Sequence, residues 1–142
     1  MEESYNLYSF LLDRTAKRVK QYAQSRFKEL GFNITVDQWL VLRHLSDNRN
    51  LTQRELADLI FKDTPTLTRI IDLLCNKGLT ERRIHPEDRR CFNVYLTSEG
   101  EKKVAEIRPL VRNVRLKAWE GLSEKDFEEF KRILNSIYTN LE

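Results

Sequence analysis

The sequence holds few of the residues on which disulfide scaffolds, metal centres and catalytic sites depend. Its 142 residues include two cysteines, two histidines, four glycines and three prolines. Cys75 and Cys91 form no CxxC pair and suggest no disulfide framework, so we expect a reducing cytoplasm. His44 and His85 have no neighbouring nucleophile motif, and the sequence has no glycine-rich phosphate loop. These absences argue against an enzyme, a metal site or a bound cofactor.

Long apolar runs are also missing, and so is a signal-peptide pattern over residues 1–10, so we expect no association with a membrane. What is present is the composition of a globular, helix-rich chain, with 33% charged and 40% hydrophobic residues. A length of 142 residues predicts a single domain that can bury a core.

Residues 51–100 carry the densest set of local signals. Thr52 and Glu55 have the spacing of a capping box, in which each side chain bonds a free backbone N–H at the start of a helix. A second helix is predicted to begin at Thr64 as its cap. Pro65 would then occupy the first helical position, where a missing N–H is tolerated.

The two helices are joined by residues 61–63, a link of the length expected in a helix-turn-helix. Gly78 is expected to end the second helix. Apolar positions at helical spacing predict that its buried face consists of Leu67, Ile70, Ile71 and Leu74. The opposite, polar side carries Thr64, Thr66 and Arg69.

Two strands joined by a charged loop are predicted next, over residues 80–84 and 92–96, with Val94 and Leu96 alternating onto one face. The loop of residues 85–91 is too charged to be part of a core. The modest basic excess of the chain, whose net charge is +3, is concentrated on this hairpin at Arg82, Arg83, Arg89 and Arg90. Such a cluster is a local footprint for phosphate. A capped two-helix unit followed by a basic hairpin indicates a winged helix-turn-helix.

Amphipathic helices are predicted before this unit. An apolar stripe over residues 4–30 predicts one long helix that Gly31 ends. Thr35 and Gln38 form a capping box for the next helix.

Two further helices are predicted after the hairpin. Ser98 is expected to cap the first, Pro109 to kink it, and the last to span residues 123–141. The seam of the first consists of Val104, Ile107, Val111, Val114 and Ala118. The flanking helices carry more apolar surface than one chain can cover, so we expect a homodimer.

The motifs of the central unit resemble those of the multiple antibiotic resistance regulator (MarR) family, in order and spacing. The matching segments are LTQRELA, TLTRIIDLL, GLTERR, PEDRR and VYLTSEG. The resemblance implies a mainly α fold with a small β-hairpin wing. Within it, residues 35–100 would be the DNA-binding lobe and residues 1–30 and 105–142 the dimerisation helices.

The function that this resemblance implies is sequence-specific regulation of transcription, as a homodimeric repressor on a pseudo-palindromic operator in double-stranded DNA. A small aromatic or anionic ligand would release it, binding between the dimer helices and the lobe near Trp39, Arg43 and the first helix. A helix fits the major groove, and a guanidinium suits a narrow minor groove. The residues expected to contact DNA are Gln53, Thr64, Pro65, Thr66, Arg69, Arg83, Asp88, Arg89 and Arg90.

Within this set the resemblance implies that Asp88 braces the hairpin while Arg90 enters the groove. Arg69 can form a bidentate bond to guanine, but its spacing to Asp72 also permits an intrahelical ion pair on a solvated face. An Asp88–Arg90 surface pair would likewise contribute little by itself to stability. The unit could then serve as a protein-interaction module that reads no DNA.

Thiol-based redox sensing is a further alternative, because some family members sense oxidants. Those that use a peroxide-reactive cysteine carry it in the first helix region, where this chain has none. Cys75 is expected to be a small core residue, and Cys91 has no evident resolving partner.

Overall fold

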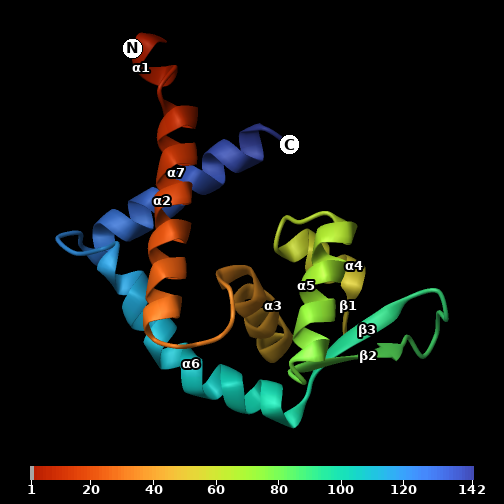
Figure 1. Ribbon diagram of the computed structural model, residues 1–142. Coiled ribbons are helices and arrows are strands. Elements are labelled where there is room, and N and C mark those ends of the chain that lie inside the picture. The colour runs from red at the N-terminus through yellow and green to blue at the C-terminus, as the bar shows by residue number, and fades with distance from the viewer. Residues whose placement is uncertain (1) are drawn as a thin grey trace.

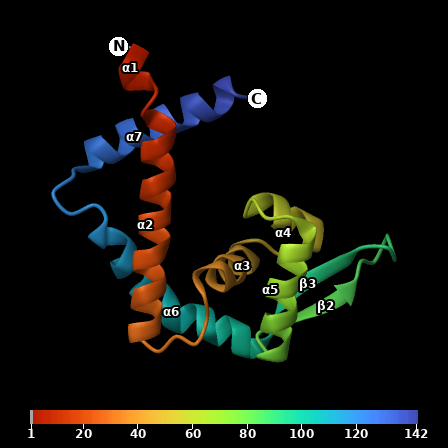
Figure 2. The ribbon, with the colours of Figure 1, turned by 45° about the horizontal axis from the view of Figure 1, so that its top comes forward.

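The computed structural model describes residues 2–142, which form a mainly helical chain with a small antiparallel sheet (Figure 1). The elements in chain order are α1 (Glu2–Tyr5), α2 (Tyr8–Glu29), α3 (Val36–Asp47), β1 (Leu51–Thr52), α4 (Gln53–Leu59), α5 (Thr64–Asn76), β2 (Thr80–Ile84), β3 (Phe92–Leu96), α6 (Ser98–Lys117) and α7 (Glu124–Asn140). Helices α3, α4 and α5 gather with the sheet in one lobe, and α2 and α7 extend away from it (Figures 1 and 2). Among residues 2–142, none of the helices combines the length and apolar character that crossing a membrane requires.

The N-terminal segment is broken, where the sequence predicted one helix over residues 4–30. A short turn, in which the N–H of Leu7 donates to the carbonyl of Ser4 at 3.3 Å, separates α1 from α2. The predicted stop at Gly31 is confirmed. Gly31 adopts a φ of +71°, and the N–H of Phe32 bonds back to the carbonyl of Phe27 at 3.1 Å.

The cap of α3 forms as predicted. The hydroxyl of Thr35 accepts from the N–H of Gln38 at 3.0 Å, and the side chain of Gln38 accepts from the N–H of Thr35 at 3.1 Å. Thr52 caps α4 by accepting from the N–H of Glu55 at 3.1 Å. The return bond from the Glu55 side chain is not found within the described residues, so this capping box is half formed.

The predicted caps of α5 and α6 are each wrong by one residue. Asp63, not Thr64, caps α5, and its carboxylate accepts from the N–H of Thr66 at 2.7 Å. Thr97, not Ser98, caps α6 by accepting from the N–H of Gly100 at 3.0 Å. Both caps have the extended backbone that this position requires, with ψ of 161° and 172°.

The sheet has three strands in the order β1-β3-β2, and the sequence predicted only β2 and β3. Both predicted strands have the expected bounds. Val94 lies opposite Leu51 of β1 on one side and Arg82 of β2 on the other. Because β1 is two residues long and pairs with a strand some forty residues later, no local sequence pattern predicts it.

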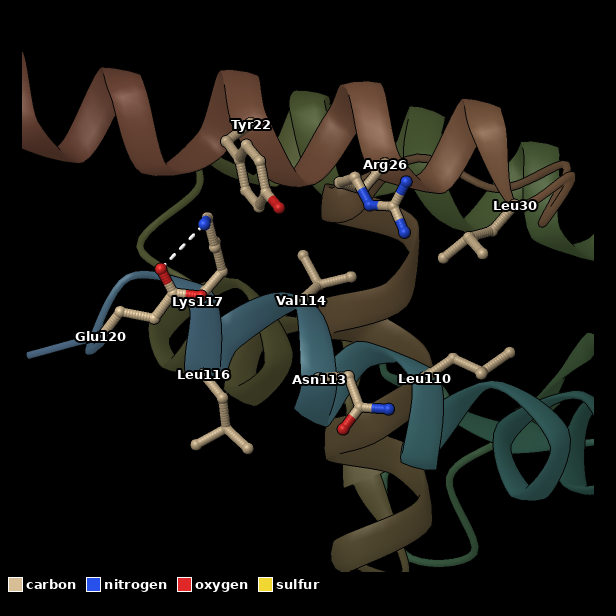
Figure 3. Close-up of a pocket in the computed structure, with 9 residues that line it drawn as sticks. All are labelled: Tyr22, Arg26, Leu30, Leu110, Asn113, Val114, Leu116, Lys117 and Glu120. Atoms are coloured by element: carbon tan, nitrogen blue, oxygen red, sulfur yellow. Dashed lines mark hydrogen bonds and ion pairs between the residues drawn. The ribbon is translucent and has the colours of Figure 1, made fainter.

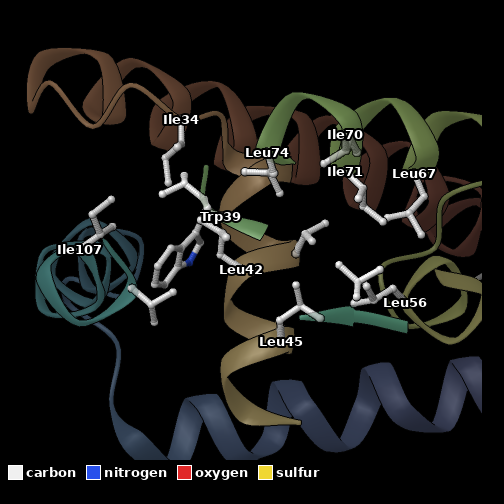
Figure 4. Close-up of a cluster of buried hydrophobic side chains, with 14 of the residues drawn as sticks. Ile34, Trp39, Leu42, Leu45, Leu56, Leu67, Ile70, Ile71, Leu74 and Ile107 are labelled. Atoms are coloured by element: carbon white, nitrogen blue, oxygen red, sulfur yellow. The ribbon is translucent and has the colours of Figure 1, made fainter. Parts of the chain in front are cut away.

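The core of the lobe forms around α3 and α5, whose apolar faces meet as predicted (Figure 4). Trp39 and Leu42 of α3 are fully buried, as are Leu67, Ile71 and Leu74 of α5. Val94 fills the sheet side, and Ile107 of α6 reaches the same cluster. This core holds α5 by one face and leaves its other face at the surface.

The two helices after the sheet differ in burial: α6 packs one face against the rest of the chain, and α7 does not. In α6 the predicted seam holds at Val104, Ile107, Val111 and Val114, but Ala118 is exposed. The helix contains Pro109 and changes direction along its length (Figures 1 and 2). No residue of α7 is buried in the single chain. The rest of the chain therefore leaves its apolar side chains Phe127, Phe130, Ile133 and Tyr138 largely exposed.

Candidate nucleic-acid interface

Helix α5 presents an exposed polar face at its first turns. Thr64, Pro65 and Arg69 are exposed there and Thr66 is half-buried. The N–H of Thr66, and then its hydroxyl, lower the pKa of the capping Asp63 by stabilising the carboxylate. This end of the helix is therefore capped at neutral pH, and its side chains project from a fixed backbone.

The Arg69–Asp72 ion pair that the sequence permits is not formed. Asp72 instead binds Arg82 of β2, with Nη2 and Oδ1 at 2.7 Å. Within residues 2–142 no ion pair or hydrogen bond engages the guanidinium of Arg69. Its five donors are therefore available to an external acceptor.

Gln53 sits differently from the outward-facing contact that the sequence suggested. Its Nε2 donates to the Thr68 hydroxyl at 2.8 Å, and its Oε1 accepts from Nε of Arg82 at 2.9 Å. Both ends of the amide are thus engaged inside the chain. The residue ties the start of α4 to α5 and β2.

The wing, defined here as residues 80–96, is braced at its tip by Asp88. Asp88 Oδ1 accepts from the backbone N–H of Arg90 at 3.0 Å and from its Nε at 3.2 Å. These bonds, the backbone one first, lower the pKa of Asp88. The Arg90 side chain is 92% exposed, so the brace holds its backbone and Nε and leaves the two terminal nitrogens of the guanidinium in solvent.

His85 contributes to the same brace, which sequence reasoning missed. Its Nδ1 accepts from the backbone N–H groups of Glu87 and Asp88, at 3.1 and 3.2 Å. The thiol of Cys91 donates to Asp88 Oδ2 at 3.6 Å, and the N–H of His85 donates to the carbonyl of Cys91 at 3.0 Å. The only signal for this role in the sequence is a histidine immediately before Pro86.

The four arginines of the wing do not form one basic surface. Arg82 is turned inward, and its side chain is only 25% exposed. Arg83 pairs with Glu81 and lies over the ring of Tyr95, 4.5 Å from the centroid. Arg89 and Arg90 are exposed. The basic surface expected to contact phosphate therefore consists of Arg89 and Arg90 at the tip of the hairpin, with Arg83 beside them.

The remaining cysteine and histidine pack within the lobe. Cys75 is half-buried against the core, as predicted, with its sulfur 3.3 Å from the Thr80 hydroxyl. His44 is also half-buried, and burial followed by Arg43 lowers its pKa. In the described part of the chain, no three His, Cys, Asp or Glu side chains cluster as metal ligands would.

A groove of about 350 Å³ lies between α2 and α6, outside the lobe (Figure 3). It is lined by Tyr22, Arg26, Leu30, Leu110, Asn113, Val114, Leu116, Lys117 and Glu120. The first long helix borders this groove, but Trp39 and Arg43, near which the sequence placed a ligand pocket between the dimer helices and the lobe, do not. Trp39 is 1% exposed because it fills the core under α6.

These features define a winged helix-turn-helix protein, and comparisons with known proteins agree. The MarR family model matches residues 34–92. Transcriptional repressor MprA of Escherichia coli (strain K12) is 28% identical over 115 residues, 81% of this chain. The chain spans 65% of the length of MprA.

Two solved structures resemble almost the whole chain. The S. aureus MepR–DNA complex has a TM-score of 0.84 and 27% identity, and the match covers 94% of this chain and 97% of MepR. Transcriptional regulator PA3341 has a TM-score of 0.81 and 32% identity, and the match covers 94% of this chain and 97% of PA3341. The chain belongs to the MarR family.

Proposed function

We propose that this chain is a homodimeric, sequence-specific DNA-binding repressor of transcription. The observation that carries the proposal is the pairing of two exposed elements on one rigid lobe. Helix α5 offers Thr64, Thr66 and the exposed Arg69, and the wing offers a braced and 92% exposed Arg90. A helix in the major groove and an arginine beside or within the minor groove is how a winged helix-turn-helix reads DNA.

The roles of the individual residues follow from their surroundings. Arg69 would contact a base edge, Thr64, Pro65 and Thr66 the neighbouring backbone or a thymine methyl, and Arg90 the minor groove. Arg83 and Arg89 would contact phosphate. Gln53 supports the interface from within, because its amide is already bonded at both ends. The relatives support the assignment, since MprA is named a transcriptional repressor and MepR was solved with DNA.

A homodimer is the assembly that the surface supports. Exposed apolar side chains follow both terminal helices, namely Tyr8, Phe10, Leu11, Leu12 and Val19 on α2 and Phe127, Phe130, Ile133, Tyr138 and Leu141 on α7 or just after it. Such stripes are stable in water only when another surface covers them. Residues 1–30 and 105–142 would therefore form the dimer module and residues 35–100 the DNA-binding lobe. Two lobes then meet half-sites about 10 base pairs apart.

Release by a small ligand is supported by the groove between α2 and α6. Leu30, Leu110 and Leu116 give it apolar walls. Arg26 and Lys117 place cations at its edge, each paired with a glutamate, Glu29 at 2.5 Å and Glu120 at 2.8 Å. An aromatic carboxylate that takes the place of Glu29 or Glu120 beside one of these cations would fit this groove, and its binding would change the spacing of the two lobes.

Nuclease protection of the DNA beside the chain's own gene tests the proposal. The expected result is a protected inverted repeat whose binding weakens steeply with salt, because phosphate contacts release counterions. Equal binding to scrambled DNA, or none, would leave the competing class, a protein-interaction module on a winged-helix scaffold. Loss of protection on adding aromatic carboxylates would identify the ligand.

A further inference from the structure

Arg82 joins three separate points of the DNA-binding lobe through one guanidinium. Its Nε donates to Gln53 Oε1 at 2.9 Å, and its Nη2 donates to the carbonyl of Thr68 at 3.3 Å. The same Nη2 lies 2.7 Å from Asp72 Oδ1. Arg82 belongs to β2, Gln53 opens α4, and Thr68 and Asp72 belong to α5. A single wing residue thus contacts both helices of the helix-turn-helix.

The network continues into the first turn of α5. Gln53 Nε2 donates to the hydroxyl of Thr68 at 2.8 Å, and that hydroxyl donates to the carbonyl of Thr64 at 2.9 Å. Thr64 carries the exposed face proposed to contact DNA. The chain of bonds therefore runs from the base of the wing to the turn of α5 from which the reading side chains project.

The position of β2 makes this role specific to Arg82. Successive strand residues face opposite sides of a sheet, so Arg82 points toward α5 while Arg83 points to Tyr95 and Glu81. β2 runs beside the C-terminal half of α5 in both views (Figures 1 and 2). At 25% exposure and with its charge matched by Asp72, Arg82 is poorly placed to contact phosphate.

We propose that Arg82 is a positioning residue that sets the orientation of the wing relative to α5, so that both elements meet DNA as one unit. This proposal rests on the proposed DNA-binding function, and it adds that the contacts of Arg82 couple the wing to α5. Lysine cannot replace this group, because only the planar fork of arginine reaches three acceptors in fixed directions. Coupling between two binding elements changes affinity by about 5- to 150-fold in proteins generally.

The test uses a double variant that conserves net charge, Asp72→Asn with Arg82→Gln. Its matched control is Asp47→Asn with Arg108→Gln, which removes another pair that joins two elements, at 3.0 Å, outside the interface. The expected result is an operator affinity lowered about 5- to 150-fold, a smaller change on scrambled DNA and an unchanged salt slope. The control should bind as the native chain does. Arg82→Lys should lose affinity in the same way, and it carries the test if the double variant fails to fold.

Two results would overturn the proposal. Native operator affinity in the double variant would show that the network does not position the elements. An equal loss on both DNAs in the double variant, which removes the charge of Arg82, with a salt slope smaller by about one, would make Arg82 a phosphate contact.

Hydrogen exchange on the free protein separates this proposal from the proposed function. The double variant should exchange faster at residues 64–69 and 80–96 and no faster in α3. If the native chain binds no DNA, the proposed function fails, and faster exchange would still support the coupling. Unchanged exchange in these segments would overturn the coupling whatever the DNA result.

Discussion

One carboxylate oxygen of Asp88 accepts two hydrogen bonds from Arg90: Oδ1 accepts from the backbone N–H of Arg90 at 3.0 Å and from its Nε at 3.2 Å. Because the pair is exposed at the surface, it adds little to the stability of the whole chain, and its effect is to order the tip of the wing. It closes the tip of the wing around the residue proposed to enter the minor groove. A loop fixed in this way loses less conformational entropy when it binds.

The pH dependence of the wing follows from this pair. The bonds from Arg90 hold the pKa of Asp88 below its usual range in the folded state. The ordering is therefore complete above about pH 4 and is lost as the pH falls through the lowered pKa. The loosening should appear as lower protection of the amides of residues 85–91 from exchange, measured from pH 7 into acid relative to the exchange rate of an unfolded chain at the same pH. Asp88→Asn should exchange faster already at neutral pH, and equal exchange in the two proteins would contradict the bracing role.

The cap of α6 gives a test of stability that involves no DNA. The Thr97 hydroxyl accepts from the N–H of Gly100 and donates to the carbonyl of Gly78 at 2.6 Å. Thr97→Ala should therefore lower the free energy of unfolding by about 1 kcal/mol or more. Ser98→Ala, the neighbouring change, should have little effect. Denaturant unfolding of both variants compares them, and a larger loss for Ser98→Ala would contradict the cap seen here.

The dimer can be tested on α7. Ile133 is 43% exposed in the single chain, so a charge there should leave the lobe folded and disrupt only a covered interface. Ile133→Asp should convert a micromolar dimer to monomer in light scattering. Asn135→Asp introduces the same charge at another exposed position of the helix and is the control. A native chain that is monomeric at this concentration would exclude the proposed dimer module.

Much of the fold could be predicted because its signals are local. The spacing of Leu67, Ile70, Ile71 and Leu74 identified the buried face of α5, and Gly31 and Gly78 ended helices as expected. The caps failed only where two adjacent residues can both accept a hydrogen bond, as at residues 63–64 and 97–98. There the backbone dihedrals decide, and the sequence does not state them.

The candidate site was predicted less completely, because several of its contacts depend on strand register. Arg82 and Arg83 are indistinguishable in sequence, yet Arg82 binds Asp72 of α5 and Arg83 lies over the ring of Tyr95. The absence of an Arg69–Asp72 pair has the same cause, because Asp72 pairs instead with Arg82, ten residues later in the chain. Asp88 and Arg90 were predictable because their contact spans only two residues.

Sequence-specific reading by α5 and the wing is tested most directly by titrating the native chain, Arg69→Ala and Arg90→Ala against operator and scrambled DNA at several salt concentrations. Arg69→Ala should lose about 1–3 kcal/mol of binding free energy on the operator and much less on scrambled DNA. Arg90→Ala should lose affinity on both DNAs, with a salt slope smaller by about one. Equal losses on both DNAs for Arg69→Ala would make it a phosphate contact. A native chain that binds operator and scrambled DNA equally would contradict sequence-specific reading altogether.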